Sequence, residues 1–247
     1  MNARKILCVL MAALILVSLC SCGKDPSSVS GEQTVTPGPS TSGTITEPEP
    51  ASEPEAEPET ETEDDENFSV GATLNNTYEN EYFGIGITLD DNWVFSTQEE
   101  INEINGFVQD TLDDDAYVEA LESGIVYTDM YAHDIDSQFT INTTIERLNA
   151  LSTFTIDEEK YIDLSMENAD LKSVLEGMGF DVSVVEKGTV TIAGEEHPGI
   201  VIEGSIEGIN FYQKVTVIKK GNYIMGITVS ALMDNIVDDI FAAFYAL

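Results

Sequence analysis

Hydrophobic and polar positions follow three different patterns along this chain of 247 residues. Residues 6–17 form an unbroken apolar run, whereas residues 23–67 carry almost no large apolar side chains. From residue 68 onward, apolar side chains recur with the two-residue period of strands or the three- and four-residue spacing of helices. The pattern predicts one globular domain at 68–247, long enough for a sizeable core, preceded by two segments that do not fold with it.

Within the domain, the periodicity predicts a definite order of strands and helices. Strands are expected at 77–80, 84–89, 125–132, 138–148, 180–187, 189–193, 197–206, 209–220 and 223–230, and residues 93–95 form a short apolar run behind a turn at 90–92. Helices are expected at 96–112 and near 117–121, then at 157–178 and 234–247. Ser96-Thr97-Gln98-Glu99 and Thr155-Ile156-Asp157-Glu158 have the form of capping boxes. Hairpin turns are expected at Gly188, Glu207-Gly208 and Gly221-Asn222.

This order predicts the fold class. Hairpins imply an antiparallel sheet, and amphipathic helices need a sheet face to cover. Apolar residues on both sides of several strands, as at Ile200-Val201-Ile202, indicate that both faces are covered. We therefore expect an α/β fold of the α+β type: a three-layer α/β/α sandwich around a mainly antiparallel sheet.

Several stretches of the domain resemble the PsbP-like superfamily: Tyr78 through Ile85, Leu89 through Trp93, Phe211 through Tyr223, and the closing segment 234–244. The resemblance covers nearly all of residues 68–247 and implies the same fold. It implies no activity, because the superfamily includes many bacterial lipoproteins without an assigned function and has no shared catalytic residues to carry over. The chain departs from the pattern at Asp90-Asp91-Asn92, where relatives often have a proline before the tryptophan.

The first segment has the three parts of a secretory signal: a basic start at Arg4-Lys5, the apolar run, and small or polar residues that lead to Cys22. A retained transmembrane anchor is the weaker interpretation, because about 20 apolar residues are needed to cross a bilayer. Leu19-Cys20-Ser21-Cys22 resembles the lipobox of bacterial lipoproteins. The resemblance implies cleavage after Ser21, a diacylglyceryl thioether on Cys22, and lipid anchoring at the extracytoplasmic face of the cell membrane.

Two alternatives remain open for this segment. Cys20 competes as the modified residue, although Leu19 before it is a poor match for the small residue expected there. Cys22 could also be only a small residue near an ordinary signal cleavage site. Because all three cysteines lie within residues 8–22, disulfides and thiolate metal sites are excluded from the folded domain.

Residues 22–67 are predicted to form a disordered stalk. A Ser/Thr/Gly/Pro-rich part is followed by a tract from Glu47 to Glu66 that holds eleven acids and no base. Low hydrophobicity with high charge cannot offset the entropy of ordering. Such a stalk would span at most roughly 150 Å and act as a spacer. A calcium-collecting or partner-binding acidic tail is the alternative.

The net charge of the domain limits the classes of partner that it can bind. Residues 67–247 contain 33 acids and seven bases, a net charge of −26. A field of this sign disfavours nucleic acid and anionic membrane surfaces, which bind clusters of Lys and Arg. It favours cations or basic partners, although a solvated acidic surface that keeps the protein soluble is the simpler explanation.

One group of residues has the composition of a metal site: Asp129, His133, Asp134 and Asp136. Metal binding requires at least three of them to converge at about 2.0–2.6 Å, and a polar turn between two strands is the interpretation we favour. The runs Asp113-Asp114-Asp115 and Asp90-Asp91-Asn92 lack the spacing and the glycine of an EF-hand loop. We expect no metal and no other cofactor.

Other candidate residues are weaker. His197 lies beside Glu195 and Glu196, but no catalytic motif accompanies the two histidines, and we predict that the protein is not an enzyme. Lysines cluster near one hairpin, where lysine commonly guards a strand edge; they are Lys214, Lys219 and Lys220. Three aromatic residues are expected in the core rather than in a ligand platform: Trp93, Tyr82 and Phe83.

Three hypotheses for function follow. The preferred one is a membrane-anchored lipoprotein whose domain docks a protein partner in the cell envelope, which predicts an exposed apolar or aromatic patch and no deep pocket. The alternative is a solute- or cation-binding lipoprotein, which predicts a concave site with converging polar groups. The third is a hydrolase, which predicts a perturbed acid or histidine in a cleft.

Overall fold

The computed structural model describes residues 68–105, 121, 124, 126–168 and 170–247. The strands are β1 (Ala72–Leu74), β2 (Thr77–Asn80), β3 (Ile85–Thr88), β4 (Trp93–Phe95), β5 (Tyr127–Asp134), β6 (Phe139–Arg147), β7 (Phe180–Ile192), β8 (Glu195–Ile206), β9 (Ile209–Lys220), β10 (Tyr223–Leu232) and β11 (Phe244–Ala246). The helices are α2 (Gln98–Ile104), α4 (Ala150–Thr155), α5 (Glu158–Asn168), α6 (Leu171–Gly177) and α7 (Val237–Phe241). The predictions for the signal segment, the stalk and residues 106–120 lie outside the described residues.

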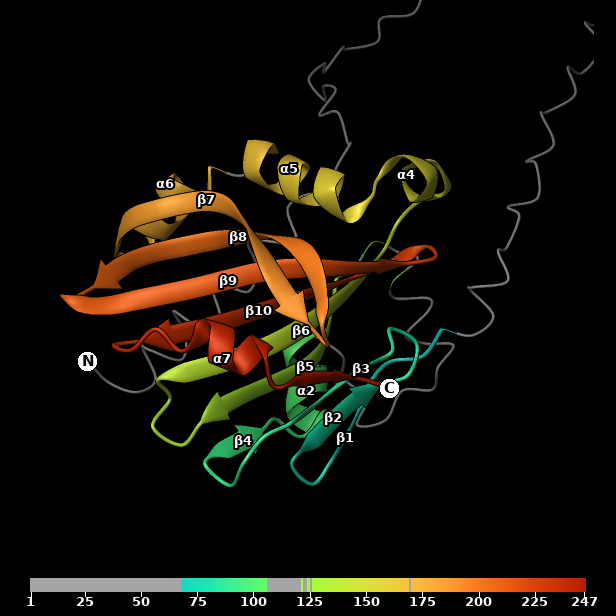
Figure 1. Ribbon diagram of the computed structural model, residues 1–247, viewed down its shortest axis with the longest axis horizontal. Helices are drawn as coiled ribbons and strands as arrows, with labels where there is room; N and C mark the ends of the chain where they lie inside the picture. Colours follow the sequence, from blue (N-terminus) through green and yellow to red (C-terminus); the bar gives the residue numbers. More distant parts are fainter. Residues whose placement is uncertain (1–67, 106–120, 122–123, 125, 169) are drawn as a thin grey trace, which may run out of the picture. The chain divides into compact units, whose positions relative to one another are not determined.

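The described strands form two antiparallel sheets. The larger one has the order β4-β5-β6-β10-β9-β8-β7, and the smaller one has the order β1-β2-β3-β11. The smaller sheet joins distant parts of the sequence, because β11 near the end of the chain pairs with β3 near the start of the domain. Figure 1 shows the small sheet at one side of the large sheet and helices α4, α5 and α6 at the other.

Alternation along the central strand β10 explains these layers. Tyr223, Met225 and Ile227 belong to the hydrophobic cluster that the large sheet shares with the small sheet. Ile224 and Leu232 belong to the cluster on the other face, together with residues of α5 and α6. A fully buried aliphatic or aromatic side chain contributes about 1.5–3 kcal/mol, so two covered faces account for a stable domain without disulfides.

The β7–β8 hairpin departs from the plane of the large sheet. Strands β8 and β9 pair from Ile206 back to Gly199, and beyond it β8 pairs only with β7. A Cβ atom at Gly199 would lie 2.6 Å from the carbonyl oxygen of Val215, so the close approach of the two strands requires glycine. Pro198 is the next residue of β8 toward the hairpin loop. Because proline has no backbone N–H to donate to β9, it is compatible with the point where the two strands separate. The end of the hairpin curves toward α7 (Figure 1).

The predicted fold class is confirmed. The chain has an α+β fold with three layers around a mainly antiparallel sheet, and both faces of that sheet are covered. The layer opposite α4, α5 and α6 contains the small sheet in addition to α2 and α7. Tyr82 and Phe83 are buried in the core as predicted, and Trp93 is half-buried against it.

The predicted helix at 157–178 is wrong, because the segment forms two helices. The carboxylate of Asp170 accepts a hydrogen bond from the backbone N–H of Ser173 at 3.1 Å and so begins a second helix. The capping boxes are also displaced. Thr97 rather than Ser96 caps α2, with Glu100 completing its box. Asp157 accepts from the N–H of Lys160 at the start of α5.

Two further predictions are wrong at the C-terminal half. The helix predicted at 234–247 ends at Phe241, because Phe244 through Ala246 pair with the otherwise open edge of β3. Gly188 is not a turn but lies inside β7, opposite Gly199. The turn falls at Ala193-Gly194, where φ values of 51° and 88° suit a two-residue hairpin loop.

Candidate functional site

The four residues that have the composition of a metal site are not brought together. His133 contacts the carbonyl oxygen of Asp134 through Nδ1 at 2.8 Å. The carboxylate of Asp134 accepts from the N–H groups of Gln138 and Phe139 in its own turn. In the part of the chain that the structure describes, no three His, Cys, Asp or Glu side chains are arranged to hold a metal ion. The lipidation residue Cys22 lies outside that part.

Asp129 instead belongs to a buried network between the two sheets. Its carboxylate accepts hydrogen bonds from the hydroxyl of Tyr78 at 2.5 Å, the amide nitrogen of Asn80 at 3.0 Å and the backbone N–H of Gly71 at 2.9 and 3.1 Å. Burial raises the pKa of Asp129, and the donated hydrogen bonds oppose that effect. The pKa of Tyr78 is raised by its own burial and then by the adjacent carboxylate. The network joins β2 to β5 and leaves no oxygen of Asp129 for a ligand.

His197 pairs with a residue that the sequence did not suggest. Its Nδ1 lies 2.9 Å from Oε2 of Glu158, the first residue of α5. The other oxygen of Glu158 accepts from the backbone N–H of Lys219 at 2.9 Å, beside the position where β8 has left β9. The hydrogen bond to Glu158 raises the pKa of His197. Glu158 therefore fastens α5 to the sheet.

Glu146 is a second acid that sequence reasoning missed. It lies near the end of β6, and its Oε2 is buried without a hydrogen-bond partner. Burial raises its pKa to about 7, against the opposing effect of a hydrogen bond with Tyr161. The only signal in the sequence is that Glu146 falls between the apolar residues Ile145 and Leu148, and the adjacent Arg147 makes that signal weak.

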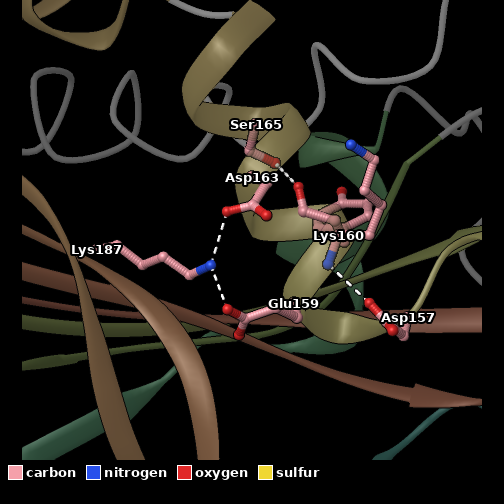
Figure 2. Close-up of polar contacts among 7 residues, drawn as sticks. Asp157, Glu159, Lys160, Asp163, Ser165 and Lys187 are labelled. Atoms are coloured by element: carbon pink, nitrogen blue, oxygen red, sulfur yellow. Dashed lines mark hydrogen bonds and ion pairs between the residues drawn. The ribbon is translucent and has the colours of Figure 1, made fainter.

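An ion cluster joins α5 to β7. Lys187 contacts Glu159 and Asp163, which lie one helical turn apart, and its distance to Asp163 is 2.7 Å. Figure 2 shows the ammonium group between the two carboxylates. The pKa of Lys187 is raised by its hydrogen bonds to Asp163 and Glu159. Because these side chains are largely exposed, the cluster positions the helix but adds little to stability.

A cleft of about 460 Å³ lies between the end of the β7–β8 hairpin and α7. Its wall combines hydroxyl, apolar and charged side chains: Thr189, Thr191, Ala193, Lys214, Asp238, Phe241, Ala242 and Phe244, with Gly194. Lys214 donates to Asp238 at 2.6 Å across the cleft. Lys220, at the end of β9 beside the β9–β10 turn, lies over the ring of Tyr82 at 5.3 Å from its centre.

Several large apolar side chains are exposed at one end of the domain. We call this the distal end and define it by Leu74, Val94, Ile135 and Met233. The N–H of Ile135 donates to the carbonyl of Asn92, beside β4. The side chain of Asn76, after β1, donates to Asp91 at 3.0 Å. These contacts bring the turns of both sheets together.

The distal end lies opposite the point where the chain enters the domain. Phe68 stacks on Tyr223, at the first residue of β10, with ring centres 4.0 Å apart. Met233 follows the last residue of the same strand, and ten residues of strand span about 30 Å. Phe154 of α4, which is 83% exposed, lies toward the entry end, since the N–H of Leu148 donates to the carbonyl of Asn222.

Comparisons with known proteins concern the fold. Neither a protein-family model nor a curated protein sequence matches the chain. Among the described helices, none is long and apolar enough to span a bilayer.

Three solved structures are similar to this chain. Cyanobacterial PsbP (CyanoP) from Synechocystis sp. PCC 6803 matches 74% of this chain and 99% of its own, at 10% identity and a TM-score of 0.41. A structure from Bacteroides thetaiotaomicron VPI-5482 matches 66% of this chain and 45% of its own, at 10% identity and a TM-score of 0.33. LpqN of Mycobacterium tuberculosis, described as involved in cell envelope biogenesis, matches 65% and 82%, at 15% identity and a TM-score of 0.34.

Proposed function

We propose that this protein is a lipoprotein, anchored through Cys22 at the outer face of the cell membrane, whose domain docks a protein partner in the cell envelope. The distal end carries this proposal. Its four apolar side chains are between 44% and 75% exposed. Exposed apolar groups of this size, gathered on one end, favour burial against another protein.

Position and charge support the same function. The distal end is the end remote from Phe68, so a stalk tethered at Cys22 would leave it free to meet a partner. Exposed acids flank it, among them Asp90, Asp91 and Asp136. A partner with an apolar centre and a basic rim complements such a surface.

The anchor can be tested separately from the docking. Replacing Cys22 by alanine removes the only thiol that the lipobox places for acylation, whereas Cys20→Ala should leave processing intact. We expect Cys22→Ala to appear in the soluble fraction or as an unprocessed precursor after membrane fractionation. Normal processing and membrane retention of Cys22→Ala would contradict the lipobox interpretation.

Docking can be tested with a photo-cross-linking residue at position 135. The matched control carries the same residue at position 154, which is exposed to a similar degree at the entry end. We expect a covalent adduct of defined protein mass in intact cells from position 135 and none from position 154. Equal yields from both positions, or no adduct from either, would contradict docking through the distal end.

The second candidate function, a solute- or cation-binding lipoprotein, is favoured by the cleft between β7 and α7. Its volume of about 460 Å³ lies within the usual range for small-molecule sites. Native mass spectrometry of the protein recovered gently from its membranes separates the two functions. A small-molecule or metal adduct supports the second, and a co-purifying protein supports the first.

A further inference from the structure

Strand β7 is a long edge strand with a free side. It has 13 residues and is the outermost strand of the large sheet, paired only with β8. Within the described part of the chain, the backbone hydrogen bonds of β7 run to β8 alone. The other sheet edges end in three-residue strands, β1, β4 and β11. Natural sheets usually shorten or cover an edge of this length.

The hairpin geometry identifies which groups of β7 are free. In a two-residue hairpin the pair next to the loop, here Ile192 and Glu195, exchanges both hydrogen bonds, and hydrogen-bonded and non-bonded pairs then alternate. The N–H and C=O groups of Thr191, Thr189 and Lys187 therefore point away from β8. Pro198, which is opposite Thr189, is consistent with this alternation. Its backbone nitrogen, which carries no hydrogen, points toward β9 and not toward β7.

Part of this edge is already protected. The pairing with β8 shifts register between Val182 and Val184, and such a bulge twists a strand edge away from incoming strands. From Val184 to Ile192 the register is regular. The regular part ends beside the cleft, whose wall includes Thr189 and Thr191. Free backbone groups and a cavity for a side chain thus lie side by side.

Charge indicates what fits there. A second copy of this chain would bring together two domains of net charge −26, so pairing of β7 with itself is disfavoured. The carboxylate of Asp238, whose side chain is 73% exposed, lies at the cleft opposite these threonines. One oxygen of this carboxylate already accepts a hydrogen bond from Lys214, and a basic side chain of an incoming strand would meet its exposed side.

We propose that the outer edge of β7, from Lys187 to Thr191, accepts an extended basic segment of the protein partner as an additional strand, with one side chain in the cleft. Backbone hydrogen bonds give such strand addition its affinity, and a pocket for alternate side chains gives its specificity. The proposal rests on the proposed function, since it assumes a protein partner, but it places a second contact away from the distal end.

The test uses the full-length protein in detergent and a synthetic peptide of alternating lysine and valine. The peptide should bind and slow hydrogen exchange at the amides of Thr189 and Thr191. The same peptide with alternate backbone nitrogens methylated should bind at least about tenfold more weakly, because it cannot donate to the edge. An analogue with glutamate in place of lysine should bind more weakly than the lysine peptide.

A pair of variants provides the matched control. Thr189→Pro removes one outward N–H without touching the bonds to β8 and should weaken peptide binding about three- to tenfold. Thr189→Val keeps that N–H, removes only the hydroxyl at the cleft wall, and should bind the peptide more tightly than Thr189→Pro. Protection elsewhere than β7, equal binding of the methylated peptide, or a dimer paired through β7 would overturn the proposal. Because the probe is synthetic, these outcomes are independent of Cys22 and of cross-linking at position 135.

Discussion

The replacement of Glu146 by glutamine gives the sharpest test of the electrostatics of this domain. In the folded protein the carboxyl of Glu146 keeps its proton up to a pH of about 7, whereas in the unfolded chain it loses it near the ordinary pKa of 4.5. Between these values the folded state binds more protons, so raising the pH favours unfolding. Each pH unit costs about 1.4 kcal/mol, and the whole interval costs about 3 kcal/mol.

Glutamine isolates this effect because it resembles the neutral acid in shape and cannot ionise. The free energy of unfolding from urea titrations of residues 23–247, measured at pH 5 and pH 8, gives the comparison. At pH 5 the two proteins should differ little, and at pH 8 Glu146→Gln should be more stable by about 3 kcal/mol. The exposed Glu81→Gln variant controls for the general loss of a negative charge. If Glu146→Gln gains less than about 1 kcal/mol between the two pH values, the burial argument is wrong.

Three further variants test other parts of the structure. Asp129→Ala leaves three buried donors unpaired and should lower the free energy of unfolding by about 3–5 kcal/mol in urea titrations, without loss of membrane anchoring. Gly199→Ala forces a Cβ against a backbone oxygen and should cost about 1–3 kcal/mol by thermal unfolding, whereas Gly177→Ala, which meets open space in α6, should be neutral or slightly stabilising. Glu158→Gln should lower the pKa of His197 in an NMR titration, and an unchanged pKa would contradict the ion pair.

Local patterns predicted most of the strands because alternation is a local property. The pairs β2–β3 and β5–β6 and the run from β7 to β10 follow from period-two patterns with turn residues between them. The exception at Gly188 has a non-local cause. Gly188 pairs with Gly199 where the sheet bends, and a Cβ atom there would lie too close to the side chain of Val201. The sequence around Gly188 is equally compatible with a turn.

The C-terminal strand could not be predicted for the same reason. Phe241 and Phe244 have the three-residue spacing of a helix face, and both are buried. The edge of β3, more than 150 residues earlier in the sequence, determines that Phe244 pairs as a strand. Tertiary pairing overrides local propensity at such positions.

For the candidate sites, too, the sequence identified single residues but not the distant residues that contact them. The composition identified Asp129 as a candidate metal ligand. Tyr78 and Asn80, which donate hydrogen bonds to its carboxylate, lie on β2, far away in the sequence. Glu158 as the partner of His197, and the free groups of β7, depend on strand divergence that no local pattern encodes.

The pairing of β11 with β3 also constrains the order in which the domain can fold. The small sheet takes three strands from residues 72–88 and its fourth from residues 244–246, so the chain must be synthesised as far as residue 246 before that sheet can close. Contacts of such sequence separation form late and slowly. Until then the edge of β3 and the apolar surface beneath Phe244 stay open, where a protease or chaperone can bind them. A chain truncated before Phe244 would therefore be cleared rather than accumulate as a folded domain.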